Sequence, residues 1–124
     1  MKALGSHLLL DLWQVPHVLL DDLEALEKQL VAAAKRGGAH VVEARFHRFE
    51  PHGVSGVVIL MESHLALHTW PELGFAAVDV FTCGSESIAE AIADEIVEAL
   101  APGKFEIRRF ERGQRAGFET MRAV

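Results

Sequence analysis

The stretch VVILMESHLALHTWPELGFAAVDVFTC, residues 57–83, decides the fold of this chain. Residues 57–61 are wholly apolar and short, which is typical of a buried strand. Residues 64–70 alternate between two sets of side chains, the period of a strand, and Pro71 ends them. A turn at residues 72–74 separates them from a further strand at residues 76–83. Three successive strands are therefore expected, with no helix between them.

Outside this stretch, apolar residues repeat at spacings of three and four in two places, which indicates helices. The first is residues 18–36, closed by Gly37 and Gly38, and the second is residues 87–100. Strands are expected at residues 3–13, 41–49 and 104–110.

The resulting order is β-α-β-β followed by β-β-α-β. It predicts a single α/β (α+β) domain over residues 1–124, a two-layer sandwich. A mainly antiparallel sheet carries two helices on one face. Half of the residues are apolar, so we expect a homodimer to cover the other face.

Composition narrows the class of protein. The chain has 124 residues and a net charge of −6, which is unfavourable for binding nucleic acid. No apolar run approaches the roughly 18 residues of a membrane span, and the first residues do not resemble a secretory signal. We therefore expect a cytoplasmic protein with no membrane partner. The one cysteine, Cys83, excludes an internal disulfide, and on composition alone it is more simply a buried apolar residue than a reactive thiol.

Polar residues concentrate between Glu62 and Glu72, and two kinds of site are disfavoured there. His64 and His68 have the i, i+4 spacing of helical zinc ligands. On a strand, however, four residues separate the rings by roughly 13 Å, so no metal site is expected. A serine hydrolase is also disfavoured, because Ser63 lacks the glycines of a nucleophile elbow.

A third reading of this segment is self-processing at Ser63. A serine at the end of a buried strand can attack the carbonyl carbon before it when the peptide is bent out of plane. The resulting ester eliminates once a base removes the Cα proton of the serine, and His68 is the nearest candidate base. The chain would break and leave a pyruvoyl ketone, which can form a Schiff base with a substrate amine. From spacing alone, a strand with polar surface residues remains the simpler interpretation.

Residues 46–84 resemble the prokaryotic S-adenosylmethionine decarboxylase family. The motifs ESHLALHTWPE and VDVFTCG carry several rare residues in the order and spacing of that family, and ERG at residues 111–113 fits its tail. The resemblance covers the catalytic third closely and the flanking elements loosely. Leu73 and Phe75 stand where members often carry tyrosine.

The resemblance implies a self-processing proenzyme. Cleavage would fall between Glu62 and Ser63, giving a β chain of residues 1–62 and an α chain of residues 63–124. The α chain would begin with a covalent pyruvoyl group derived from Ser63. His68 matches the processing base and Ser55 an assisting hydroxyl. Cys83 matches the acid that protonates the carbanion, a task that suits a thiol with a reference pKa of about 8.5.

The resemblance also implies the substrate and the reaction. Phe49 and Trp70 match aromatic walls for the sulfonium and purine of S-adenosylmethionine, and Glu72 matches the carboxylate that holds the ribose hydroxyls. The expected enzyme is an S-adenosylmethionine decarboxylase that supplies the aminopropyl donor for spermidine and other polyamines. Its pocket is expected at the interface of a homodimer.

Two alternatives stay open. One is a pyruvoyl-dependent arginine or ornithine decarboxylase on the same scaffold, and the other is a non-processing regulatory homologue. The sequence also poses a geometric problem, because Ser63 and His68 have opposite parity on a straight strand. We expect either a bend at Ser63 or a β-bulge to bring them together.

Overall fold

A computed structural model describes residues 3–83 and 86–124, apart from the side chain of residue 86. Its helices and strands, in chain order, are β1 (Gly5–Trp13), α1 (His17–Leu20), α2 (Leu23–Arg36), β2 (Val41–Arg48), β3 (Val54–Leu60), β4 (Ser63–Trp70), the 3-10 turn η1 (Pro71–Leu73), β5 (Phe75–Thr82), α3 (Glu86–Leu100), β6 (Lys104–Arg112) and the 3-10 segment η2 (Arg115–Thr120).

The strands form one six-stranded sheet in the order β2-β3-β4-β5-β1-β6. Every neighbouring pair is antiparallel. The short connections β2–β3, β3–β4 and β4–β5 pair consecutive strands, and β1 then inserts between β5 and β6. This α+β architecture confirms the fold class expected from the sequence.

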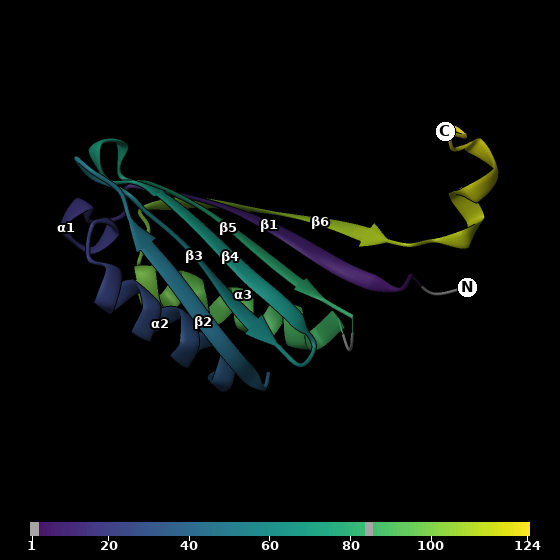
Figure 1. Cartoon of the computed structure of the whole chain (residues 1–124), viewed down its shortest axis with the longest axis horizontal. Coiled ribbons are helices and arrows are strands. Elements are labelled where there is room, and N and C mark those ends of the chain that lie inside the picture. Colours follow the sequence, from purple (N-terminus) through teal and green to yellow (C-terminus); the bar gives the residue numbers. More distant parts are fainter. Residues whose placement is uncertain (1–2, 84–85) are drawn as a thin grey trace.

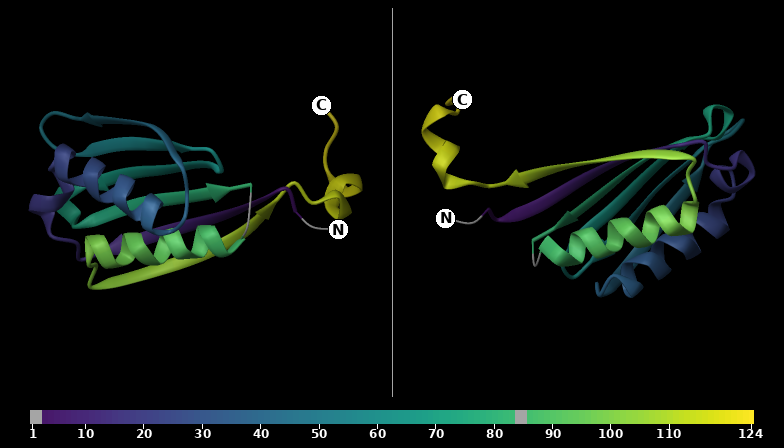
Figure 2. Two further views of the ribbon diagram at one scale, coloured as in Figure 1. Left: turned by 90° about the horizontal axis from the view of Figure 1, so that it is seen from below. Right: turned by 180° about the vertical axis from the view of Figure 1, so that it is seen from behind.

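Two helices cover one face of the sheet. Figures 1 and 2 show α2 and α3 lying side by side beneath the strands, with no helix of the described residues on the other face. Along β4, the buried residues Leu65, Leu67 and Thr69 alternate with more exposed ones, so they belong to the helix side. Full burial of a leucine contributes about 1.5–3 kcal/mol, and the buried core is rich in such side chains.

The exposed side chains of β4 define the open face of the sheet, the face without helices. They include the exposed His68 and Trp70, together with the partly buried His64. Within the described residues, no helix is long and apolar enough to cross a membrane. The C-terminal part of β6 and η2 extend away from the helices, as the yellow end of the ribbon in Figure 1 shows.

The helix expected at residues 18–36 is in fact two helices. The break falls at Asp21 and Asp22, inside the range expected to form one continuous helix. Asp22 is extended and its side chain accepts a hydrogen bond from the N–H of Ala25 at 3.0 Å, so it caps a new helix. A short acidic side chain competes for backbone donors, and this favours a cap over a helix interior.

Several strand ends also differ from the sequence expectation. β3 begins at Val54, three residues before the apolar run at residues 57–61. The loop before it closes with Phe49 N–H donating to the Gly53 carbonyl at 2.7 Å. β6 continues to Arg112, because β1 still offers it a partner at Gly5. The sequence pattern underestimates a strand's length where a neighbouring strand can continue the hydrogen-bonded pairing.

Candidate active site

Ser63 begins β4 in an unusual backbone conformation. Its φ angle is 147°, in a region that favours glycine and costs a non-glycine residue about 1–3 kcal/mol. The carbonyl oxygen of Glu62, immediately before it, accepts a hydrogen bond from the N–H of Cys83 at 2.8 Å. The bend expected at Ser63 is therefore present, and a backbone donor points at the carbonyl that a Ser63 attack would polarise.

His40 holds the side chain of Glu62. The ring Nδ1 of His40 lies 2.8 Å from one carboxylate oxygen, and its backbone N–H donates to the other at 3.1 Å. The carbonyl of His40 in turn accepts from Met61 N–H at 2.9 Å. The side-chain contact with His40, followed by the backbone one, lowers the pKa of Glu62 below its usual value. Nothing in the sequence singled out His40, which lies outside every motif.

His68 and Ser55 face each other across β3 and β4. They are paired residues in the ladder, and the Ser55 hydroxyl lies 2.8 Å from His68 Nδ1. His68 is exposed and Ser55 partly buried. The structure therefore brings together the two residues that resemblance linked to processing.

Ser63 and His68 do not meet within one chain. The pairing of β4 with β3 and with β5 is continuous from Ser63 onward, so the expected β-bulge is absent. Five residues of regular strand separate the two by roughly 17 Å. The bend at Ser63 changes the local backbone but leaves His68 at a distance that one protomer cannot close.

The expected substrate-binding residues lie at the other end of β4. Trp70 ends the strand, roughly 23 Å from Ser63 along seven residues. Its ring packs against Phe75 at 5.4 Å between centroids, and Trp13 packs against the same Phe75 at 4.3 Å. Phe75, one of the two departures from the family pattern, thus supports the Trp70 wall. Phe49 is half exposed in the β2–β3 loop.

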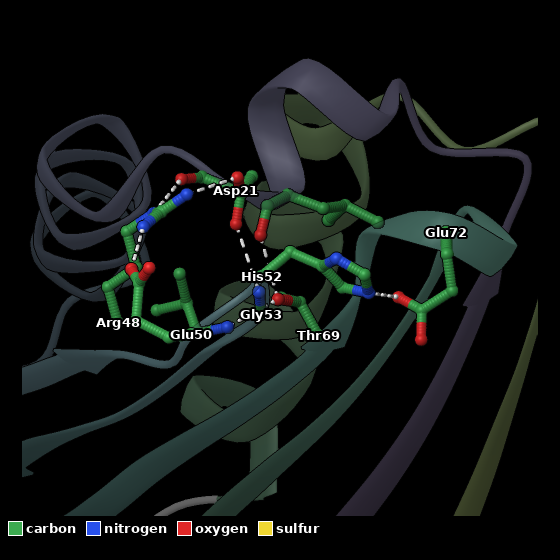
Figure 3. A network of polar contacts seen from close by, with 9 residues as sticks. Asp21, Arg48, Glu50, His52, Gly53, Thr69 and Glu72 are labelled. Atoms are coloured by element: carbon green, nitrogen blue, oxygen red, sulfur yellow. Dashed lines mark hydrogen bonds and ion pairs between the residues drawn. The ribbon is translucent and has the colours of Figure 1, made fainter.

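Glu72 is paired with His52 at 3.0 Å, in η1 just beyond Trp70. Figure 3 shows this pair beside a second network centred on Asp21, in the connection between α1 and α2. The N–H of Gly53 donates to Asp21, and Arg48 bridges Asp21 and Glu50. The bond from Gly53, then the charged bond from Arg48, lower the pKa of Asp21. The sequence pointed to Asp21 only through its neighbour: two aspartates stand together, whereas one, Asp22, is enough to cap the helix.

A groove of about 960 Å³ opens at this Trp70 end, and its lining includes Glu72, His52 and Asp21. Ser63 and Cys83 do not line it, and of the three expected substrate-binding residues only Glu72 does, since Phe49 and Trp70 are not among its lining residues. Cys83 is exposed, unlike the buried filler that composition suggested. Within residues 3–83 and 86–124, no group of three or more His, Cys, Asp or Glu is placed to hold a metal ion. The candidate residues therefore lie in two groups at opposite ends of β4. The Ser63 end comprises His40, Glu62, Ser63 and Cys83, and the Trp70 end comprises Phe49, Trp70 and Glu72.

Comparison with known proteins defines the class first. Residues 6–113 match the sequence profile of the family described as S-adenosylmethionine decarboxylase. The fold is similar to a crystal structure of the adenosylmethionine decarboxylase from Aquifex aeolicus, with a TM-score of 0.87 and 39% identity over 92% of this chain and 94% of that one. The chain therefore belongs to the class of small decarboxylases with an α+β fold.

Individual relatives identify the family to which the chain belongs. An S-adenosylmethionine decarboxylase proenzyme of Methanococcus vannielii is 49% identical over 113 residues, covering 91% of this chain and 93% of that protein. A Bacillus anthracis relative, named S-adenosylmethionine decarboxylase proenzyme 2, is 47% identical over 90% of this chain and 91% of its own. The chain belongs to the S-adenosylmethionine decarboxylase family.

Proposed function

We propose that the chain cleaves itself between Glu62 and Ser63 and then decarboxylates S-adenosylmethionine. The product is the aminopropyl donor for spermidine and other polyamines. The observation that carries this proposal is the Ser63 end: a strained serine follows a carbonyl that already accepts a backbone hydrogen bond from Cys83. The proenzyme names of its relatives support the cleavage.

The cleavage needs only groups of the protein and one water molecule. Ser63 Oγ bonds to the carbonyl carbon of Glu62, and negative charge develops on that carbonyl oxygen. The peptide C–N bond then breaks, the hydroxyl proton passes to the nitrogen of Ser63, and an ester is left. The N–H of Cys83, 2.8 Å from the oxygen before reaction, stabilises the charge as an oxyanion-hole donor does. A base then takes the Cα proton of Ser63, and Glu62 leaves as the new carboxyl terminus of residues 1–62. The dehydroalanine left at position 63 tautomerises to an imine, which water hydrolyses to the pyruvoyl ketone with release of ammonia. Relief of the strained φ at Ser63 favours the first step.

The residues at this end fit the pyruvoyl group that cleavage would leave at position 63. As an electrophilic ketone, that group supplies covalent attachment for the substrate amine and takes up electrons as carbon dioxide leaves. Cys83 is exposed beside it and provides the thiol that returns a proton to the substrate carbon. The backbone and the side chain of Cys83 therefore serve different steps.

A second protomer completes the site in this proposal. His68 and Ser55 lie roughly 17 Å or more from Ser63 in their own chain, and Trp70 lies farther still. His68 and Trp70 share the open face, which no helix covers. A two-fold dimer that packs these faces in opposite directions places the Ser55–His68 pair and the Trp70 end of one copy over Ser63 of the other, twice by symmetry.

Recognition of S-adenosylmethionine falls to the Trp70 end. Exposed aromatic faces of Phe49 and Trp70 attract a sulfonium and stack on a purine. The carboxylate of Glu72 is oriented by His52 and can accept bonds from the ribose diol. Arginine and ornithine carry neither purine nor ribose, so these residues favour the nucleoside substrate over both. The expected compartment is the cytoplasm.

Intact mass and substrate preference test the activity. Purified wild-type protein should show two fragments under denaturing conditions, and Ser63→Ala should show one chain. Released carbon dioxide should be far greater from S-adenosylmethionine than from arginine or ornithine at equal concentration. Preferred turnover of either amino acid would assign the alternative decarboxylase. An uncleaved, inactive wild-type chain would assign the regulatory homologue.

A mixed-chain experiment tests whether the site is shared. Ser63→Ala cannot cleave, and His68→Ala lacks the base, so each alone should remain largely intact. When the two variants are refolded together, the His68→Ala chain can receive His68 from its Ser63→Ala partner and should split. Fragments from a tagged His68→Ala chain support the shared site, and their absence from verified mixed dimers contradicts it.

A further inference from the structure

The loop that carries Phe49 is fastened at both of its ends by one carboxylate. Residues 49–53 connect β2 to β3, and the loop closes where the Phe49 N–H donates to the Gly53 carbonyl. Arg48 precedes this loop and Gly53 ends it. Both donate to Asp21, which comes from the α1–α2 connection 27 and 32 residues earlier.

The contacts on Asp21 leave little freedom. Arg48 Nη2 donates to Oδ2 at 2.7 Å, and the Gly53 N–H donates to Oδ1 at 2.9 Å. Arg48 Nε also reaches the backbone carbonyl of Asp21 at 3.3 Å. Figure 3 shows the two carboxylate oxygens directed to these two donors. The arginine bond carries opposite charges, which makes it stronger than a neutral one.

A buried threonine fixes the same loop to the strand of Trp70. The hydroxyl of Thr69, which is 7% exposed, donates to the carbonyl of Leu20 at 2.7 Å and accepts from the N–H of Val54 at 2.9 Å. Leu20 adjoins Asp21, and Val54 adjoins Gly53. Thr69, the residue beside Trp70, therefore holds both the α1–α2 connection and the end of the loop.

We propose that Asp21 is a positioning residue for substrate binding: by holding Arg48 and Gly53 it sets the place of Phe49 relative to Trp70. This inference rests on the proposed function, in which those two rings receive the sulfonium and purine. Asp21 contacts neither Ser63 nor Cys83 and takes no part in self-cleavage. Its loss should weaken substrate binding and leave the chemical step alone.

The neighbouring residue offers a matched control. Asp22 is also a carboxylate in the α1–α2 connection, yet its side chain caps α2 by accepting from Ala25 N–H. Asparagine caps a helix about as well as aspartate does. Asp22→Asn therefore removes the same charge from the same connection without touching the loop.

The test compares Asp21→Asn with Asp22→Asn. In Asp21→Asn, the amide NH₂ replaces an acceptor that faces Arg48. The KM for S-adenosylmethionine should rise at least about fivefold, while kcat per cleaved chain and the rate of self-cleavage stay within about twofold of wild type. Hydrogen exchange at the Gly53 amide should become faster. Asp22→Asn should keep the wild-type KM and the wild-type exchange at Gly53.

Several outcomes would overturn the inference. Equal KM values in Asp21→Asn and wild type contradict it, as does a fall in kcat with KM unchanged. An equal rise of KM in both variants assigns the effect to charge alone. If Asp21→Asn does not fold, Arg48→Gln removes the guanidinium contacts to Asp21 and Glu50 but keeps the bond from Gly53 to Asp21. It should raise KM by a smaller factor, and an unchanged KM there also contradicts the inference. A wild-type chain that does not turn over S-adenosylmethionine contradicts the proposed function instead.

Discussion

The two ends of β4 use polar contacts in opposite ways. At the Ser63 end, His40 and the Cys83 N–H hold a backbone that is itself unfavourable, with φ at 147°. At the Trp70 end, Thr69 and Asp21 satisfy the donors and acceptors of a loop and keep it in one place. In the proposed function, the first arrangement stores strain for the single cleavage event, whereas the second keeps the substrate-binding loop in place through many turnovers.

The difference teaches why one strand can serve both tasks. Regular pairing along β4 keeps the two ends roughly 23 Å apart, so strain at one end does not disturb the loop at the other. Variants at the Ser63 end should therefore affect cleavage or the chemical step, and variants at the Trp70 end should affect substrate binding.

The largest expected effect is on turnover in Cys83→Ala. The alanine retains the backbone N–H that faces Glu62, so the chain should still cleave, whereas decarboxylation loses its general acid, worth typically about 10²–10⁴-fold. Mass spectrometry measures cleavage, and carbon dioxide release per cleaved chain measures turnover. Normal turnover in this variant would remove the thiol from the mechanism.

The next effect is on self-cleavage in His40→Ala. Loss of the ring contact to Glu62 should let the strained Ser63 relax, although the backbone contact of residue 40 remains. Strain of about 1–3 kcal/mol corresponds to at most roughly five- to 150-fold in rate. A time course of intact mass after refolding gives the rate. His17→Ala, an exposed histidine at the far end of the sheet, is the control. Normal cleavage in His40→Ala would show that the His40 ring is not needed to hold the peptide, and that the backbone donors of residues 40 and 83 suffice.

Trp70→Ala should separate binding from cleavage. The KM for S-adenosylmethionine should rise roughly ten- to hundredfold, because about 1–3 kcal/mol of aromatic contact is lost, and cleavage should remain normal. Trp13→Ala is the matched control, since Trp13 packs on the opposite side of the same Phe75 and is similarly exposed. A similar rise of KM in both variants would mean that binding depends on the packing around Phe75 and does not require direct contact between Trp70 and the substrate.

The smallest effect concerns acid stability. The pKa of Asp21 is lower in the folded chain than in the unfolded chain because Gly53 and Arg48 bind the carboxylate. The ionised form therefore stabilises the fold above the unfolded pKa of about 3.9, and this contribution is lost as the pH falls from there through the folded pKa. Urea unfolding should show wild type more stable than Asp21→Asn at pH 7, with the difference shrinking below about pH 4. A difference that does not change with pH would contradict this assignment.

Much of the fold followed from local pattern. The two-residue alternation of residues 64–70 and the three- and four-residue repeats of the helices gave the right elements and the right class. The errors fell where tertiary pairing acts: β3 starts earlier than its apolar run, and the helix expected at residues 18–36 breaks at Asp21 because Asp22 caps the second part. Helix and strand propensities of single residues could not show that the pairing of β3 and the cap by Asp22 would prevail over the local pattern.

The motif residues were predictable, and their arrangement was not. Sequence alone determined that a serine, a histidine and a thiol of suitable chemistry occur around one apolar strand, because side-chain chemistry and strand period are local properties. Only the tertiary structure decided that Ser63 and His68 lie far apart on one protomer, that Cys83 N–H faces Glu62, and that Asp21 and His40 hold the two ends. These contacts join residues distant in the chain, and their geometry depends on how the strands pair and where the helices pack.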